Sequence, residues 1–534
     1  MASKLWAAGL LLLAVACSGE PDRPEPLPAL PPAVERSGDA PRGELRPTRV
    51  ARLALVGEVR GEIEPCGCPT LPFGGFPRRA RLLSQLSEGD ASPIFHLDAG
   101  EALLKGQSTG TPDPERVKLL LDLQREVGVQ AWAPGPTDLR ALGLEGLVAE
   151  AAREDGPRLV SATWVGADGR PVLPTGAVLE RGGIRLGVIG LSALPTDRAL
   201  RDVVRGADPV ESARAAVAAL PPDLDLVVAL SNLAEAERDR VAAEVPGLAA
   251  VLSVRGSAFD EPKAASAGAT PIIEAPDRGR YVQLIRLRLG SGPGQPLVLQ
   301  PPSRDWRDLE AMRRVTDPSA EAAARRDTLE RRFEALGEGR NLAEATPMPL
   351  GAELDGETAI AAQLKAFHAD ALQEAAAEAA RAPRDSERGY GSSGACVNCH
   401  INEFARWAFS PHAGAWEALV LRRATEDSDC VACHTTGFGQ PGGLGELSSA
   451  NLSRFKGVQC EACHGPMGGH PDDDRVRATP LSEARCRTCH DEANSPSFDY
   501  ETYLRRATCQ GGAPELSQPP LNPDGSVNPA AGGR

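Results

Sequence analysis

The feature that most constrains this chain is a five-residue motif that occurs four times between Cys396 and His490. In each copy two cysteines are separated by two residues and followed directly by a histidine. In such a C-x-x-C-H run the two thiols can add to the vinyl groups of a haem, and the histidine can ligate its iron. Four copies therefore predict four covalently attached haems c. The attachment residues are Cys396, Cys399, His400, Cys430, Cys433, His434, Cys460, Cys463, His464, Cys486, Cys489 and His490.

Two zinc sites or a disulfide framework are the alternatives for these cysteines. Paired zinc knuckles do not require a histidine after every second cysteine, whereas all four pairs here have one. The motif also uses eight of the twelve cysteines of the chain. The haem interpretation is therefore preferred.

The first 16 residues have the form of a secretory signal peptide. Lys4 precedes an apolar run from Leu5 to Ala16 that is too short to span a bilayer and ends in small residues. Cys17, directly after this run, looks like the lipidated cysteine of a bacterial lipoprotein; an ordinary small-residue cleavage site at the same bond is the alternative. The chain is thus predicted to be exported, as a periplasmic or outer-membrane-associated lipoprotein whose lipid holds it to the membrane. Export agrees with the haems, because c-type attachment in bacteria takes place outside the cytoplasm.

Residues 17–50 are rich in Pro, Glu, Arg and Ala and contain almost no large apolar side chain, so we expect a disordered tether. Residues 511–534 are expected to form a disordered tail. The formal net charge of −15 argues against nucleic acid as a partner.

Three cysteines remain once the haem motifs and Cys17 are assigned, namely Cys66, Cys68 and Cys509. Cys66 and Cys68 form a C-x-C pair, which in an exported protein can be a disulfide, a soft-metal site or two free thiols. Because three is an odd number, at least one of these cysteines has no partner of its own kind within the chain.

Between residues 51 and 290, short runs rich in leucine and β-branched residues alternate with stretches of helical period. This alternation predicts a layered α/β fold in which helices cover the strands. Helices are expected at residues 78–86, 114–127 and 234–243. Strands are expected at residues 52–56, 93–97, 159–163, 184–191, 224–230, 249–252, 271–274 and 281–289.

Five short motifs in this segment together resemble the metallophosphoesterase domain of the 5′-nucleotidase family. They are G-E-V-R-G from Gly57, G-G-F-P-R-R-A from Gly74, L-D-A-G-E from Leu97, G-V-I-G-L from Gly187 and V-A-L-S-N from Val228. The resemblance implies a layered sandwich. In that family a dinuclear metal centre activates water for phosphoester hydrolysis.

The positions of the family's metal ligands carry different residues in this chain. The first Asp-x-His pair falls on Glu58 and Arg60, and the Gly-Asp aspartate falls on Glu101. The Gly-Asn-His block falls on residues 135–138, which hold neither asparagine nor histidine, and the later histidines fall on Asn232, Arg255 and Ser257. Arginines at ligand positions would repel the cations, so we expect a scaffold without hydrolytic activity. The alternative is a residual metal-dependent phosphoesterase that uses the remaining carboxylates.

A Pro- and Gly-rich boundary follows at residues 290–303, and residues 303–385 are expected to form a helical linker. Residues 306–336 carry many Glu and Arg at i, i+4 spacing, which favours a solvated helix. Residues 357–382 carry an apolar stripe that favours a second helix, with His368 beside the stripe.

The residues around the haem motifs are similar to the cytochrome c-554 family of tetrahaem electron carriers. The likeness rests on S-P-H-A from Ser410, T-T-G-F from Thr435, F-K-G-V-Q-C-E-A-C-H-G-P from Phe455, and the nearby His470. It implies that residues 391–510 form a mainly α-helical, loop-rich tetrahaem cytochrome c domain. It also implies closely paired haems, most irons with two histidines and one iron without a strong distal ligand.

Eight histidines must supply the axial ligands. His400, His434, His464 and His490 are the proximal ligands, and His412 and His470 are the natural distal ligands; the alternative is that these two are surface histidines. His368 could reach a third iron. The fourth iron would then have Met467, His96 or no distal ligand, and at least one open or weakly ligated iron is expected.

The sequence thus predicts an exported multihaem electron carrier with a catalytically silent phosphoesterase-like scaffold. Its partners would be an unidentified redox protein and, through the N-terminal lipid, a membrane. The alternative class is an enzyme, either a redox enzyme that acts on a small molecule at an open iron or a residual phosphoesterase.

Overall fold

The computed structural model describes most of the chain from residue 49 to residue 507. The described residues are 49–67, 72–88, 92–104, 112–256, 270–290, 296–300, 305, 308–309, 312, 319–337, 341–381, 389–470, 472–473, 476–491, 494–495 and 497–507. They fall in one compact unit, Thr48–Arg534. The predicted signal peptide, nearly all of the tether, the tail, and Cys17, Cys68 and Cys509 lie outside the described residues. No described helix combines the length and the apolar character of a membrane span.

The first sheet has seven strands and is mixed. Its strand β1 runs parallel to β4 and antiparallel to β14. The strand order is β15 (Val298–Gln300), β16 (Leu342–Pro349), β14 (Tyr281–Leu289), β1 (Arg49–Val56), β4 (Ile94–Asp98), β5 (Ala131–Trp132) and β6 (Arg158–Leu159).

The second sheet has five strands, four of them parallel, with the antiparallel β8 at one edge. The order is β13 (Ile272–Pro276), β12 (Ala250–Gly256), β11 (Leu226–Ser231), β9 (Ile184–Leu191) and β8 (Gly176–Arg181). Two short ladders complete the strands: β2 (Cys66–Gly67) with β3 (Pro72–Phe73), and β7 (Trp164–Val165) with β10 (Arg205–Gly206).

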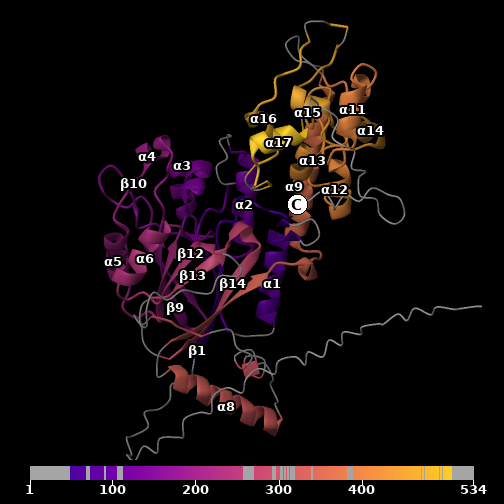
Figure 1. Ribbon diagram of the computed structural model, residues 1–534. Coiled ribbons are helices and arrows are strands. Elements are labelled where there is room, and N and C mark those ends of the chain that lie inside the picture. Colours follow the sequence, from indigo (N-terminus) through magenta and orange to yellow (C-terminus); the bar gives the residue numbers. More distant parts are fainter. Residues whose placement is uncertain are drawn as a thin grey trace, which may run out of the picture. The chain divides into compact units, whose positions relative to one another are not determined.

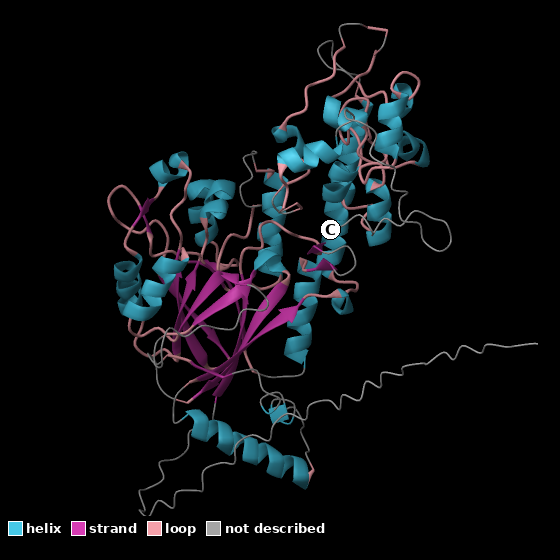
Figure 2. Ribbon diagram, viewed as in Figure 1, coloured by secondary structure: helices cyan, strands magenta, loops and turns pink. Residues whose placement is uncertain are grey.

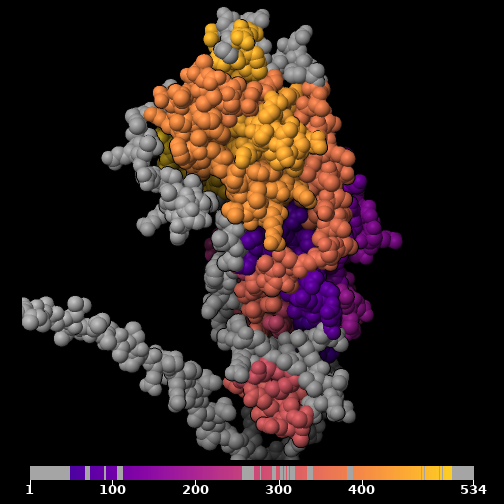
Figure 3. Space-filling view, turned by 90° about the vertical axis from the view of Figure 1, so that its right-hand side faces the viewer, coloured from indigo at the N-terminus to yellow at the C-terminus, as the bar shows by residue number. Residues whose placement is uncertain are grey.

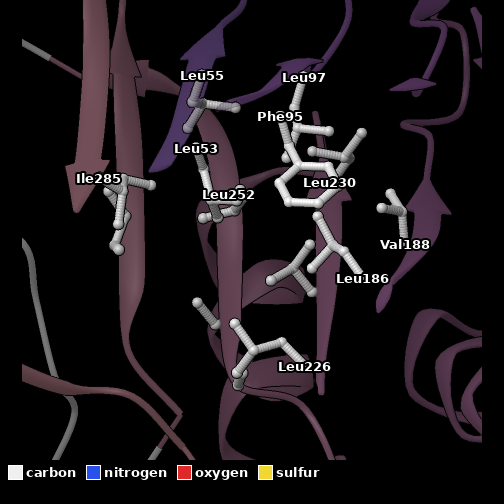
Figure 4. Packing of buried hydrophobic residues seen from close by; sticks show 14 of the residues in the cluster. Leu53, Leu55, Phe95, Leu97, Leu186, Val188, Leu226, Leu230, Leu252 and Ile285 are labelled. Atoms are coloured by element: carbon white, nitrogen blue, oxygen red, sulfur yellow. The ribbon is translucent and has the colours of Figure 1, made fainter. Parts of the chain in front are cut away.

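The main core lies between the two sheets, whose inner faces pack against each other. Leu53, Leu55 and Phe95 come from the first sheet, and Leu186 and Leu230 come from the second (Figure 4). All five are nearly or fully buried. Strands covered on both faces read as continuous apolar runs, which is why the sequence identified them.

Helices cover the outer faces of both sheets, which gives four layers (Figures 1 and 2). The first sheet carries α1 (Phe76–Glu88), α2 (Pro114–Glu126) and α3 (Pro136–Ala151). The second carries α5 (Pro209–Ala219) and α6 (Glu235–Glu244), and the short α4 (Arg198–Val203) lies next to α3. The N-termini of two helices are encoded in the local sequence. Asp113 caps α2 and Asp208 caps α5, each just before a proline. The predicted layered α/β fold is confirmed.

The predicted helical linker differs from the structure in one respect. Its helices form as α8 (Ala320–Gly337) and α9 (Ala359–Ala380), but between them β16 pairs with β14 along eight residues, from Leu342 to Pro349. The segment therefore belongs in part to the first sheet. The strand escaped sequence analysis because L-A-E-A-T-P-M-P contains one β-branched residue and two prolines, a composition that does not favour strands. A short 3-10 turn, η2 (Ala352–Leu354), leads on towards α9.

The C-terminal helical region, residues 389–507, is built from short helices joined by loops, as predicted. It forms the orange and yellow part of the surface in Figure 3. Its largest apolar cluster contains five buried side chains, Trp416, Leu419, Val431, Leu444 and Phe455. The helices are α10 (Ser393–Cys396), α11 (Ile401–Ala408), α12 (Ala415–Arg422), α13 (Ser428–His434), α14 (Ser449–Phe455), α15 (Cys460–His464), α16 (Glu483–Arg487) and α17 (Tyr500–Ala507).

Truncation of the inter-sheet core should destabilise the α/β layers strongly. Phe95 is completely buried between the sheets, so Phe95→Ala should lower the free energy of unfolding by about 3–5 kcal/mol through the lost contacts and the cavity. Urea unfolding followed by far-UV circular dichroism measures this loss. The control is Val148→Ala at an exposed position, expected to change stability by no more than about 0.5 kcal/mol. Equal effects of the two substitutions would contradict the assigned core.

Candidate haem sites and the sheet-edge cluster

Each C-x-x-C-H motif lies on a short helix or a single helical turn. In the first and fourth copies the backbone N–H of the histidine donates to the carbonyl of the first cysteine, from His400 to Cys396 and from His490 to Cys486, both at 2.9 Å. Side chains four residues apart on such a turn share one face. The turn therefore directs the histidine and the first thiol of each motif to the same side.

The first motif adjoins the third, although 64 positions separate Cys396 from Cys460. A hydrogen bond between the thiols of Cys396 and Cys460 lowers the pKa of Cys396 to about 7. Glu461, which is buried inside the third motif, accepts backbone N–H bonds from Gly391 and Ser392 at 2.8–2.9 Å. These bonds hold the approach to the first motif against the third.

The second motif adjoins the fourth in the same manner. A hydrogen bond from Cys433 lowers the pKa of Cys489 to about 7. The Cys433 Sγ also lies 4.0 Å from the carbonyl oxygen of Thr488 in the fourth motif. The four motifs thus form two pairs, first with third and second with fourth, and the sequence alone did not reveal this pairing.

Two pairs of histidine rings lie at a centroid spacing that suits a metal ion between them, with ring planes inclined at 31° and 55°. The ring centroids of His412 and His490 are 6.0 Å apart, and those of His400 and His470 are 6.5 Å apart. A metal–imidazole bond is about 2 Å long and the ring centroid lies about 1 Å behind the nitrogen, so trans ligands have centroids about 6 Å apart. Each of the two histidines predicted as distal ligands therefore lies near one predicted proximal histidine at this spacing.

The second ring nitrogen of two proximal histidines is held by the protein. The Nδ1 of His434 lies 2.6 Å from the carbonyl oxygen of Ala415, and the Nδ1 of His490 lies 2.9 Å from the hydroxyl of Ser495. Metal-binding histidines usually engage the non-ligating nitrogen in this way, which fixes ring orientation and tautomer. Both rings thus keep Nε2 for an iron.

The environment of His412 favours a neutral ring, the form that binds metals. Burial, followed by the nearby His490, lowers the pKa of His412. Its position is fixed through the backbone, because the N–H of Val458 donates to the His412 carbonyl at 2.9 Å. Trp407 Nε1 in turn donates to the carbonyl of Val458 at 2.7 Å.

Large apolar side chains around the motifs lie on the surface of the protein. Ile401, Phe409, Val420 and Leu421 are 54–73% exposed, and the amphipathic helix α11 has no buried residue. A porphyrin is a large apolar plane that such side chains can contact. Together with the histidine spacing and the held Nδ1 atoms, this makes the residues present fit covalently bound haem.

His368 on α9 is buried at the start of the second motif helix, α13. Its Nδ1 lies 3.0 Å from the hydroxyl of Ser428, and its Nε2 lies 3.6 Å from the carboxylate of Glu64. Burial lowers the pKa of His368, but the nearby carboxylates of Glu64, Asp427 and Asp429 outweigh burial and raise it above the usual value. The role of His368 as a third distal ligand stays a prediction.

Of the other candidates for the fourth iron, His96 lies apart from the histidine pairs, whereas the Met467 carbonyl accepts the N–H of His470 at 3.0 Å. His96 is buried on β4 inside the α/β layers, with its Nδ1 3.1 Å from the Val127 carbonyl. Burial and the nearby Arg79 lower the pKa of His96 to about 3. Met467 is half-buried, and its backbone N–H donates to Glu461.

The described side chains expected at the metal centre lie at one edge of the two sheets, where they bind other groups of the protein. Glu58 is buried and lies 3.4 Å from Arg60 in an ion pair. Both residues, with Glu101 and Arg278, have positive φ angles of 47–59°, a left-handed conformation unusual for side chains of this size. Strain of this kind clusters at functional sites and at their remnants.

Two buried side chains at this edge form hydrogen bonds with backbone groups. Asn232 accepts from Ala193 N–H at 2.8 Å and donates to the carbonyls of Ala99 and Ala133. Asp138 accepts four backbone N–H bonds at 2.8–2.9 Å, from Glu101, Ala102, Leu103 and Gly135. These side chains stabilise the loops.

Glu101 is engaged in the same way. Its carboxylate accepts a bond from Thr137 N–H at 3.2 Å and another from the Thr137 hydroxyl. Among the described residues no group of three or more His, Cys, Asp or Glu side chains is arranged to hold a metal ion. The side chain of Arg255 and all of Ser257 lie outside what the structure describes.

Parts of the α/β layers are similar to solved phosphoesterase structures. One is a 5′-nucleotidase precursor from Thermus thermophilus, at 17% identity and a TM-score of 0.42, over 60% of this chain and 59% of that one. Another is the calcineurin-like phosphoesterase YfkN from Bacillus subtilis, at 13% identity and a TM-score of 0.41, over 61% of this chain and 98% of that one. Nothing about activity follows from these likenesses.

The C-terminal helical region is similar to proteins of a haem-binding family. Residues 395–465 match the family described as cytochrome c554 and c-prime. A stretch of 129 residues is 30% identical to cytochrome c-554 of Nitrosomonas europaea, and covers 21% of this chain and 54% of that protein. The chain thus spans about half the length of the curated relative it matches. Residues 395–465, which hold three of the four motifs, are therefore similar to the cytochrome c-554 family, as the sequence led us to expect.

Proposed function

We propose that residues 391–510 bind four haems c covalently and transfer electrons between redox partner proteins. The observation that carries this proposal is the placement of His412 opposite His490 and of His470 opposite His400, at ring distances that fit a shared iron. Haem iron supplies reversible one-electron redox chemistry. The similarity to cytochrome c-554 supports the same conclusion.

The chain's own residues arrange the four sites for transfer. The first motif lies beside the third and the second beside the fourth, so each attachment site has a neighbour at short range. Backbone bonds to Glu461 fix the first of these pairs. Held Nδ1 atoms keep two proximal rings in one orientation, which limits movement when an electron arrives.

We further propose that the α/β layers are a scaffold without hydrolytic activity. The support is that Glu101, Asp138 and Asn232 are bonded to the protein itself and that Arg60 supplies a positive charge beside Glu58. Export, a lipid on Cys17 and attachment to a membrane complete the proposal, and these rest on the N-terminal sequence.

A second candidate function is redox chemistry on a small molecule at an open iron. His400 and His490 each face another histidine ring, whereas the described residues show no such ring contact for His434 or His464. An iron with one strong ligand can bind a small molecule at its other side. Carbon monoxide binding to the reduced protein distinguishes this candidate from a pure electron carrier.

The haem content should be four per chain when the protein is produced with a cytochrome maturation system. The reason is that all four C-x-x-C-H copies are intact and each turn places its thiol and histidine on one side. Mass spectrometry of the intact protein measures the number of added haems. A protein that carries no haem, or zinc in its place, would overturn the proposal.

Removal of a distal ligand should change one iron and leave the others unchanged. His412→Ala and His470→Ala should each convert one low-spin haem to high spin and shift its reduction potential, because each removes a strong donor opposite one proximal histidine. Electron paramagnetic resonance counts the spin states, and haem content should remain at four. The exposed Glu446→Gln serves as the control. Unchanged spin states in both histidine variants would refute the ligand assignment.

Hydrolysis of nucleotides or of a chromogenic phosphoester should stay at background when manganese, zinc or calcium is supplied. We expect this because the sheet-edge side chains are bonded to one another and to the backbone instead of being available to a metal ion. Metal-dependent turnover that disappears in Glu58→Ala and Glu101→Ala would contradict the proposed silent scaffold. Phosphoesterase activity would then become the preferred function of the α/β layers.

A further inference from the structure

The long helix α9 belongs to both packing regions of the protein. It is a continuous helix of 22 residues without glycine or proline. Near its beginning, Ile360 and Leu364 are buried in the apolar cluster formed with α2 and α3, and Phe367 packs against the same cluster. The helix also contacts α1 in the α/β layers and α13 in the C-terminal helical region (Figure 1).

The second half of α9 packs closely against a glycine-rich loop of the C-terminal helical region. The N–H of Gly442 donates to the carbonyl of Ala379 at 3.0 Å. A Cβ atom added at Gly445 would lie 2.8 Å from the Cβ of Ala379, closer than real Cβ atoms come. Alanine on the helix and glycine on the loop therefore allow the two backbones to approach. One rigid helix thus joins the two regions without a hinge.

Arg116 of α2 makes a second connection, and it is directed at the second haem motif. Its Nη1 lies 2.5 Å from the carboxylate of Asp429, and its Nη2 donates to the carbonyl of Gly61 at 2.8 Å. Asp429 lies in the first turn of α13, one residue before Cys430. Arg116 thus bonds the α/β layers to the helix that carries Cys430, Cys433 and His434.

His368 adds a third bond to the same turn of α13. Its Nδ1 meets the hydroxyl of Ser428, and both residues are more than nine-tenths buried. Asp427 caps the turn by accepting from the N–H groups of Asp429 and Cys430. Three successive residues, Asp427, Ser428 and Asp429, are therefore engaged at the point where the α/β layers meet this helix.

We propose that Arg116 is a positioning residue for the second haem, through which the α/β layers set the reduction potential of the haem held by Cys430, Cys433 and His434. The proposal rests on the proposed function, since it requires a haem at this motif. It gives the hydrolytically silent layers a role in electron transfer. The guanidinium balances the charge of Asp429 beside the attachment helix, and the local charge is one of the properties that set a haem potential.

The charges of Arg116 and Asp429 predict the direction in which the reduction potential of the second haem shifts in each variant. Arg116→Ala leaves the Asp429 carboxylate unbalanced, which favours the more positive ferric state, so the potential of one haem should fall. Asp429→Asn removes the negative charge and should raise the potential of the same haem. A role in packing alone would move the potential in one direction in both variants. Arg116→Lys keeps the charge and should restore most of the original potential.

Redox titration of the full haem-loaded protein, followed optically and by electron paramagnetic resonance, measures the four potentials. The matched control is Arg125→Ala on the same helix, because Arg125 is equally exposed, at 18%, and pairs with Asp122 and Glu150 inside the α/β layers. Ionic strength of about 0.01 M keeps screening weak, with a Debye length of about 30 Å. Arg125→Ala should leave all four potentials unchanged.

The outcomes separate this inference from the proposed function. If the parent protein lacks haem, the proposed function fails before the variants are measured. If the parent carries four haems and one potential moves in opposite directions in Arg116→Ala and Asp429→Asn, the inference is supported. If both variants keep four haems and all potentials stay in place, or move alike, the inference is overturned while the electron-transfer proposal stands. If Arg116→Ala loses a haem, Asp429→Asn alone tests the inference. A rise in the potential of one haem supports the inference, and a fall or no change overturns it.

Discussion

The C-terminal helical region is built around two pairs of cysteine motifs whose members lie far apart in the sequence. Its largest apolar cluster has five buried side chains, too few to hold a region of this length by burial alone. Cys396 lies beside Cys460 and Cys433 lies beside Cys489, so the motifs form two pairs. The backbone bonds to Glu461 and the proposed electron path both depend on this pairing.

At the sheet edge, buried polar side chains are bonded to the protein itself. Asp138 binds four backbone N–H groups, and Asn232 connects three loops, so the loops remain in place. The ion pair of Glu58 with Arg60 places a guanidinium where a cation would otherwise be needed. Positive charge supplied by a side chain neutralises carboxylates but cannot activate water as a metal ion does.

The sequence identified those parts of the fold whose residue types carry a local signal. The runs from Leu226 to Ser231 and from Tyr281 to Leu289 are apolar and β-branched, and both are strands. The run from Leu342 to Pro349 lacks that composition, and it became a strand because β14 offers it an edge, which is a tertiary effect.

The candidate site likewise combines features that a local sequence pattern predicts with features that depend on tertiary structure. Spacing within each motif predicts the attachment residues, and the count of histidines points to His412 and His470 as distal ligands. Which motif each of them faces depends on the folded loops, such as the bond between Val458 and His412, and no local pattern encodes it. The part played by Arg116 was equally hidden, because its partner Asp429 lies 313 positions away.

The length of α9 makes the position of its C-terminal end depend on how its N-terminal end is packed. Twenty-two residues at 1.5 Å each extend about 33 Å, and the helix is seated near its start by Ile360 and Leu364. The placement of its start therefore also sets where Ala379 meets the glycine-rich loop. Substitutions deep in the α/β layers would thus shift the loop beside the second motif without touching it, and variation at the two ends of α9 is expected to be coupled.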